Sequence, residues 1–156
     1  MTEKTKHYAK AEMLIRKPIE DVFQAFINPE ITTKFWFTKS SGKLEEGKET
    51  QWTWEMYNHS ISVRTKMIEL NKKIVIEWGN YDEITTVEWI FKNLGEARTF
   101  VSIVNTGFLG DTEKIISQIQ DSTEGYTLVL AGLKAYLEHN IELNLISDRF
   151  PKELNE

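Results

Sequence analysis

Aromatic side chains are the residues of this 156-residue sequence whose types and spacing could do the most specific chemistry. All five tryptophans lie before residue 90. Alternation places Trp52, Trp54 and Met56 on one face of one predicted strand, and Trp89 and Phe91 on one face of another. Such a pattern indicates either a ligand pocket lined by aromatic rings or a large core, because aromatic residues dominate both.

The candidate pocket consists of the apolar and aromatic side chains that alternation turns towards one face of the sheet, together with positions on the last long helix. We expect its lining to contain Trp36, Trp52, Trp54, Met56, Trp78, Trp89, Phe91, Ile103, Asn105, Leu128 and Gly132. These positions all depend on register, because a slip of one residue turns every side chain of a strand to the opposite face.

Asn105 is the polar member of this set. It shares its parity with Val101 and Ile103, so it can point inward. A buried asparagine needs hydrogen-bond partners and can anchor the polar group of a ligand. The alternative is that Asn105 ends its strand and bonds the following turn, a position that asparagine favours.

Small residues form a stripe on the predicted last helix. Gly125, Leu128, Gly132 and Ala135 recur at three- and four-residue steps and therefore share one face. Glycine inside a helix costs about 1 kcal/mol relative to alanine, so the stripe needs a reason. Either the helix backbone packs closely against the sheet, or the stripe leaves room for a ligand, and the sequence fits both.

The sequence contains no recognisable catalytic or metal-binding pattern. It has no cysteine, and His7, His59 and His139 are not at metal-ligand spacing from one another. No nucleophile elbow, phosphate-binding glycine loop or dinucleotide fingerprint is present. We therefore expect no catalytic residue, no metal and no cofactor.

The charge balance argues against nucleic acid as a partner. The 19 Lys and Arg residues against 24 Asp and Glu residues give a formal charge of −5, whereas phosphate backbones require clustered basic residues. No apolar run approaches the ~20 residues that span a bilayer, and residues 1–10 lack the apolar stretch of a secretory signal. We expect a cytoplasmic monomer without membrane insertion.

The elements that must position these side chains follow from hydrophobic periodicity. Residues 7–16 are predicted to form a strand, and residues 18–36 two short helices, the second capped by Asn28. From residue 38 to residue 106, repeated alternation broken by short polar links predicts antiparallel strands, because such links cannot hold crossover helices. In this pattern the run Ile61, Val63, Thr65 and Met67 keeps one face throughout.

The last third of the sequence is helical in pattern. Asp111 is predicted to cap a helix over residues 112–120. Asp121 or Ser122 is predicted to cap a second, longer helix that ends near Asn140. One sheet and one long apolar-faced helix must cover each other. The chain is thus expected to be a single α+β domain over residues 1–156, a helix-grip in which a curved antiparallel sheet of about seven strands wraps around a long C-terminal helix, with two short helices after the first strand.

Several stretches resemble bacterial homologues of the activator of heat-shock protein 90 ATPase, over about residues 8 to 150 in all. These stretches are residues 15–26, 28–30, 35–37, 76–78, 86–89, 107–108, 122–126 and 130–138, with Tyr126 where tryptophan is common. The resemblance implies the START-like (SRPBCC) superfamily, which includes lipid-transfer START domains, plant Bet v-type allergens and polyketide cyclases. Its members hold an apolar molecule in a cavity between the sheet and the long helix.

Three functions remain open at this point. The first is a small binding protein with a hydrophobic cavity for an apolar or aromatic small molecule, lipid-like or polyketide-like. The second is a protein-interaction module of co-chaperone type that contacts a chaperone, which predicts an exposed apolar patch instead of a void. The third is a cyclase- or hydrolase-type enzyme, which needs acid–base groups that point inward; the acid–base sets of the cyclase branch do not map onto these residues.

Overall fold

In the described residues, 7–79 and 83–154 of the computed structural model, seven strands form one antiparallel sheet in the order β1-β7-β6-β5-β4-β3-β2. The strands from β2 to β7 form a meander, and β1 pairs with β7. Their bounds are β1 Tyr8–Ile15, β2 Lys39–Ser40, β3 Glu49–Trp54, β4 His59–Glu69, β5 Lys73–Trp78, β6 Thr85–Asn93 and β7 Thr99–Thr106. The predicted antiparallel meander is confirmed.

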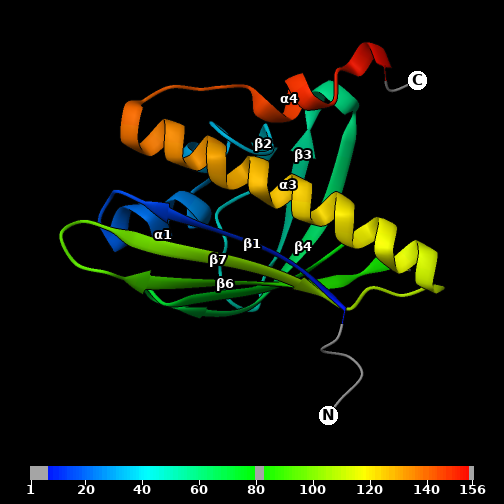
Figure 1. The fold of residues 1–156 in the computed structure, drawn as a ribbon, viewed down its shortest axis with the longest axis horizontal. Coiled ribbons are helices and arrows are strands. Elements are labelled where there is room, and N and C mark those ends of the chain that lie inside the picture. Colours follow the sequence, from blue (N-terminus) through cyan, green and yellow to red (C-terminus); the bar gives the residue numbers. More distant parts are fainter. Residues whose placement is uncertain (1–6, 80–82, 155–156) are drawn as a thin grey trace.

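The long helix packs on one face of the sheet (Figure 1), and the shorter helices follow the first strand and the long helix in the sequence. The helices are α1 Ile19–Ile27, α2 Pro29–Thr32, α3 Thr112–His139 and α4 Leu145–Arg149, with 3₁₀ turns η2 Glu55–Tyr57 and η4 Lys152–Leu154. Figure 1 shows α3 crossing one face of the sheet, while β3 and β4 bend away from β6 and β7 towards α4. This arrangement is the predicted helix-grip of α+β class. Among the described helices, none combines the length and hydrophobicity of a membrane span.

The first helices form as their caps predict. Asn28 accepts a hydrogen bond from the Glu30 N–H at 3.1 Å, and Pro29 occupies the first turn of α2, where its missing N–H costs nothing. The apolar face of α1 buries Phe23 and Phe26 against the sheet, where both rings contact Phe91. These ring contacts pack α1 against β6.

Two predictions of strand continuity are wrong. β3 ends at Trp54, because residues 55–57 turn into η2, so Met56 does not share a strand face with Trp52 and Trp54. In β4 the register shifts between Thr65 and Met67. A bulge inserts one residue and turns the following side chains over, so Thr65 is buried while Met67 is 40% exposed.

The prediction of two helices in the last third is also wrong, because α3 is continuous from Thr112 to His139. Asp111 does cap it, accepting a hydrogen bond from the Lys114 N–H at 2.8 Å. Asp121 and Ser122 lie inside the helix. Their preference for a cap is weaker than the gain from burying one long apolar face, which includes Val129, Leu130 and Leu133, against the sheet.

A polar clamp holds the end of α3 on β1. Lys134 Nζ donates to the carbonyl of Leu14 at 3.1 Å and to Glu138 at 2.7 Å, and Glu138 accepts the Arg16 N–H at 2.7 Å. Burial would raise the pKa of Glu138, but the hydrogen bonds from Lys134 and Arg16 and the charge of Lys134 outweigh it and lower that pKa. The carboxylate therefore stays charged and joins the helix to the strand.

Replacing the cap of α3 tests its continuity. We expect Asp111→Ala to lower the free energy of unfolding by about 1 kcal/mol, because the Lys114 N–H loses its partner. Asp121→Ala, inside the helix, should change it by less than about 0.5 kcal/mol. Urea denaturation of both variants measures the difference. An equal cost at the two positions would contradict a single uninterrupted helix.

Candidate ligand-binding site

Two hollows lie next to each other between the sheet and α3, and Trp78, Asp121 and Ser122 border both. The larger, here called the polar cavity, has a volume of about 360 Å³. Its wall consists of His59, Ile61, Trp78, Gly79, Glu83, Ile84, Thr85, Asn105, Gly107, Phe108, Leu109, Lys114, Gln118, Asp121 and Ser122. The ends of four strands and the first half of α3 meet there, so the site draws on parts of the chain far apart in sequence.

The smaller hollow, here called the aromatic hollow, has a volume of about 240 Å³. Its wall consists of Trp36, Trp54, Trp78, Asp121, Ser122, Gly125, Tyr126, Val129 and Ile146. The rings of Trp36, Trp78 and Tyr126 contact one another, with centroids 5.8 to 6.2 Å apart. Such contacts hold the rings in place and leave apolar surface facing the space.

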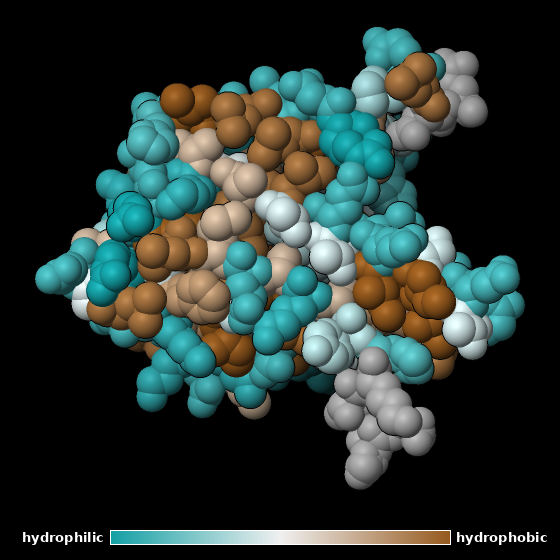
Figure 2. Space-filling model, in the orientation of Figure 1, coloured by the Kyte–Doolittle hydropathy of each residue, from teal (hydrophilic) through white to brown (hydrophobic). Residues whose placement is uncertain are grey.

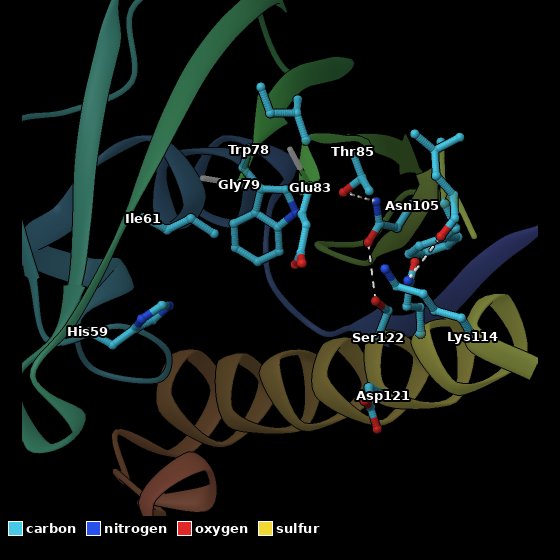
Figure 3. A pocket seen from close by; sticks show the side chains of 15 residues that line it. His59, Ile61, Trp78, Gly79, Glu83, Thr85, Asn105, Lys114, Asp121 and Ser122 are labelled. Carbon is cyan, nitrogen blue, oxygen red and sulfur yellow. Dashed lines mark hydrogen bonds between the residues drawn. The ribbon is translucent and has the colours of Figure 1, made fainter. Parts of the chain in front are cut away.

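Asn105 is the polar centre of the site. Its side chain is buried, and its Nδ2 donates to Thr85 Oγ1 at 2.9 Å and to the Thr86 carbonyl at 2.8 Å. Its Oδ1 accepts the hydroxyls of Ser122 at 3.3 Å and Tyr126 at 3.4 Å, and Figure 3 shows Asn105 and Ser122 pointing towards one another. Asn105 therefore points inward, the first of the two alternatives, and its side chain bonds the start of β6 and α3 instead of the turn that follows β7.

The two hydroxyl bonds to Asn105 are long. Hydroxyl–oxygen hydrogen bonds are usually 2.7 to 2.8 Å, so those from Ser122 and Tyr126 are weak. Burial raises the pKa of Tyr126 well above its usual value. Its hydroxyl thus stays protonated and can donate to another acceptor placed between the two hollows.

Charged side chains also line the polar cavity. Glu83, Lys114 and Asp121 are exposed, and His59 lies at the far end from Asn105 in Figure 3. In the described part of the chain no three His, Asp or Glu side chains come together in a group that could hold a metal ion. The arrangement combines apolar walls with neutral hydrogen-bonding groups and with the carboxylate of Glu83, which lies beside the Trp78 ring in Figure 3.

The structure brings together only part of the predicted lining. Trp36, Trp54 and Trp78 border the aromatic hollow, and Trp78 and Asn105 border the polar cavity. The other predicted aromatic and aliphatic strand residues, Trp52, Trp89, Phe91 and Ile103, are buried in the core away from both hollows. The pocket and the core share one sheet face, which is why alternation could not separate them.

The remaining predicted positions lie elsewhere. Met56 belongs to η2 and borders a groove under the C-terminal residues, together with Gly132. Leu128 is half-buried on α3 and borders neither hollow.

Two residues of α3 that were not predicted to line the pocket, Ser122 and Tyr126, complete the site together with Gly125 of the small-residue stripe. Ser122, Gly125 and Tyr126 border the aromatic hollow with Val129. Their spacing of three, four and seven residues puts them on one helical face, so the periodicity could have identified them. Of the small-residue stripe, Gly125 borders the aromatic hollow, whereas Leu128, Gly132 and Ala135 do not.

The two glycines of α3, Gly125 and Gly132, differ in how closely their surroundings are packed. A Cβ atom on Gly125 would meet nothing within 4 Å, whereas one on Gly132 would lie 3.1 Å from the Cβ of Phe35. Close backbone packing therefore explains Gly132, and open space beside the aromatic hollow explains Gly125. Each of the two alternatives drawn from the stripe applies at one position.

The sequence profile of the family described as "Activator of Hsp90 ATPase homolog 1-like protein" matches residues 16–138. The chain belongs to this family. Its match begins just after β1 and ends one residue before the end of α3, so the family's common region contains both hollows except for the single contribution of Ile146. No protein with a curated description matches the sequence.

Solved structures share this family fold. The crystal structure of SSP2350 from Staphylococcus saprophyticus is 31% identical, with a TM-score of 0.75, and the match covers 87% of this chain and 95% of that one. The solution structure of the Aha1 dimer from Colwellia psychrerythraea is 18% identical, with a TM-score of 0.71 and coverage of 85% and 96%. DynU16, a protein of the dynemicin biosynthetic locus, is 14% identical, with a TM-score of 0.77 and coverage of 88% and 49%. The last two likenesses concern the fold alone.

Alanine at the two glycines tests their surroundings in this family member. We expect Gly125→Ala to raise the free energy of unfolding by about 1 kcal/mol, since alanine is the better helix former and the added methyl group has room. Gly132→Ala should lack this gain, because the methyl group must displace the buried Phe35. Thermal and urea denaturation compare the two; equal stabilisation would show that Gly132 is not tightly packed.

Proposed function

We propose that this protein binds a small apolar or aromatic molecule, lipid-like or polyketide-like, in the polar cavity and the aromatic hollow. The observation that carries the proposal is the placement of Ser122 and Tyr126 hydroxyls, with weak bonds to the buried Asn105, at the junction of two hollows with apolar walls. Binding sites of this kind combine aromatic walls with a few converging polar groups.

The walls supply the binding free energy. Each Å² of apolar ligand surface removed from water contributes roughly 25 cal/mol, so about 300 Å² gives roughly 7.5 kcal/mol before ordering costs are subtracted. This amount supports dissociation constants in the micromolar range or weaker. The ligand's apolar part lies against the indole of Trp78 and extends towards Trp36 and Trp54.

The hydroxyls supply orientation. A carbonyl, ether or hydroxyl oxygen of the ligand accepts hydrogen bonds from Ser122 and Tyr126 in place of the long bonds to Asn105. Asn105 keeps its two shorter bonds to β6 and stays in place during this exchange. A ligand without any acceptor leaves the two hydroxyls as weakly bonded as before, so it binds less tightly.

Family membership and the structural neighbours support the proposal of a small-molecule-binding protein. The fold is one with a long helix over a curved sheet, and DynU16 comes from a biosynthetic locus for the natural product dynemicin. We therefore favour polyketide-like and lipid-like compounds as the first ligands to test.

Filling the aromatic hollow tests this function. We expect 1-anilinonaphthalene-8-sulfonate and oleate to bind the unmodified protein and to change its tryptophan fluorescence. Gly125→Leu should weaken binding at least tenfold, because its side chain enters the hollow without a clash at Cβ. Gly42→Leu is the matched control, since Gly42 is exposed, also has open space at Cβ and borders neither hollow.

Two outcomes would contradict the proposal. Binding that Gly125→Leu leaves unchanged would place the probe elsewhere on the protein. No binding of either probe, together with a faster heat-shock protein 90 ATPase on addition of this chain, would favour the interaction module instead.

A further inference from the structure

The C-terminal segment, residues 141–154, borders the aromatic hollow through Ile146 of α4. Figure 1 shows α4 beside the ends of β3 and β4. No residue of α4 or η4 is fully buried. Figure 2 shows apolar surface over the end of α3 and the chain that follows, where Ile141 and Leu143 are 49% and 44% exposed.

Empty space borders this segment on its other sides as well. A groove of about 190 Å³ separates residues 142–147 from Phe35, Trp36 and Gly132. A second space, of about 370 Å³, lies between residues 147–153 and the turn η2. Both spaces are open to solvent, so the segment contacts the body of the protein along only part of its length, with Ile146 packed against the core.

Two residues with left-handed backbone bound the chain that joins α3 to α4. Asn140, which ends α3, and Asn144, which precedes α4, both adopt the left-handed conformation, with φ of 54° and 56°. Between them the chain has no regular structure. A five-residue helix such as α4 is too short to be stable by itself, so its position depends on contacts with the body.

Ile146 packs against the core, and polar side chains add further contacts between the segment and the body. The hydroxyl of Tyr57, in η2, donates to the carbonyl of Phe150 at 2.6 Å and lies 3.3 Å from that of Ile146. Arg149 pairs with Glu124 of α3, but both side chains are exposed, and such pairs contribute little. The Tyr57 hydroxyl is thus the principal latch.

We propose that residues 141–154 form a lid that turns at Asn140 and Asn144, is held closed by Tyr57, and opens to let the ligand of the proposed function enter and leave the aromatic hollow. The proposal rests on that function. When the lid lifts, Trp36, Trp54 and Met56 become accessible, and the aromatic hollow joins the groove beside Gly132. A ligand too large for the closed hollow can then be held there.

The test removes only the latch hydroxyl from the full chain, by Tyr57→Phe. Tyr8→Phe, at an exposed tyrosine of β1, is the matched control. Hydrogen exchange of the amides of Asp148 and Phe150 reports lid opening without any ligand, because α4 is too short to keep these bonds once it leaves the body. Stopped-flow mixing with 1-anilinonaphthalene-8-sulfonate reports its association and dissociation rates.

We expect exchange of these amides to quicken about tenfold in Tyr57→Phe and to remain unchanged in Tyr8→Phe. Association and dissociation should quicken by a similar factor, with the dissociation constant within twofold, because the latch is the same in free and bound protein. Quicker exchange with unchanged binding rates would overturn the lid and place the entrance at the polar cavity. Unchanged exchange would overturn Tyr57 as the latch, and absence of binding to the unmodified protein would overturn the proposed function and the lid together.

Discussion

The approach of α3 to the body of the protein is tight at Gly132 and open at Gly125, and the remaining features of the site depend on this difference. At Gly132 the helix backbone touches Phe35, and two residues later Lys134 bonds β1. About two helical turns nearer the N-terminus, at Gly125, the same helix faces the aromatic hollow instead of a side chain. A rigid helix fixed at one end and held off at the other leaves a hollow between itself and the sheet.

The aromatic core determines where that hollow can lie. Phe37 stacks on Trp52 with ring centroids 4.4 Å apart, and Trp89 contacts Phe26, so the centre of the molecule is filled by its own rings. Beneath α3, space remains towards the ends of β5 to β7, beside Trp78, and between α3 and the rings of Trp36 and Trp54. A ligand that enters this protein therefore meets tryptophan faces on one side and the hydroxyls of α3 on the other.

Asn105 connects this space to the stability of the sheet. Its amide bonds the first residues of β6, and its carbonyl oxygen faces the helix. A buried amide is costly unless it is bonded, so the strand end, the helix and the polar centre of the site are tied to one side chain. The family shares the fold around this residue, but the chemistry that distinguishes one ligand from another belongs to the individual side chains of the two hollows.

Local patterns in the sequence determined the elements of this fold. Alternation identified the buried faces of β5, β6 and β7. The caps at Asn28 and Asp111 could be predicted because each side chain accepts a hydrogen bond from a backbone N–H within three residues. The curved sheet and its covering helix followed from the need to bury those faces. Only the tertiary structure decided that Asp121 continues a helix, that β4 contains a bulge before Met67, and that Trp36 borders a hollow while Trp52 fills the core. Each of these features depends on contacts between residues distant in sequence. Periodicity within one helix or strand carries no information about such contacts.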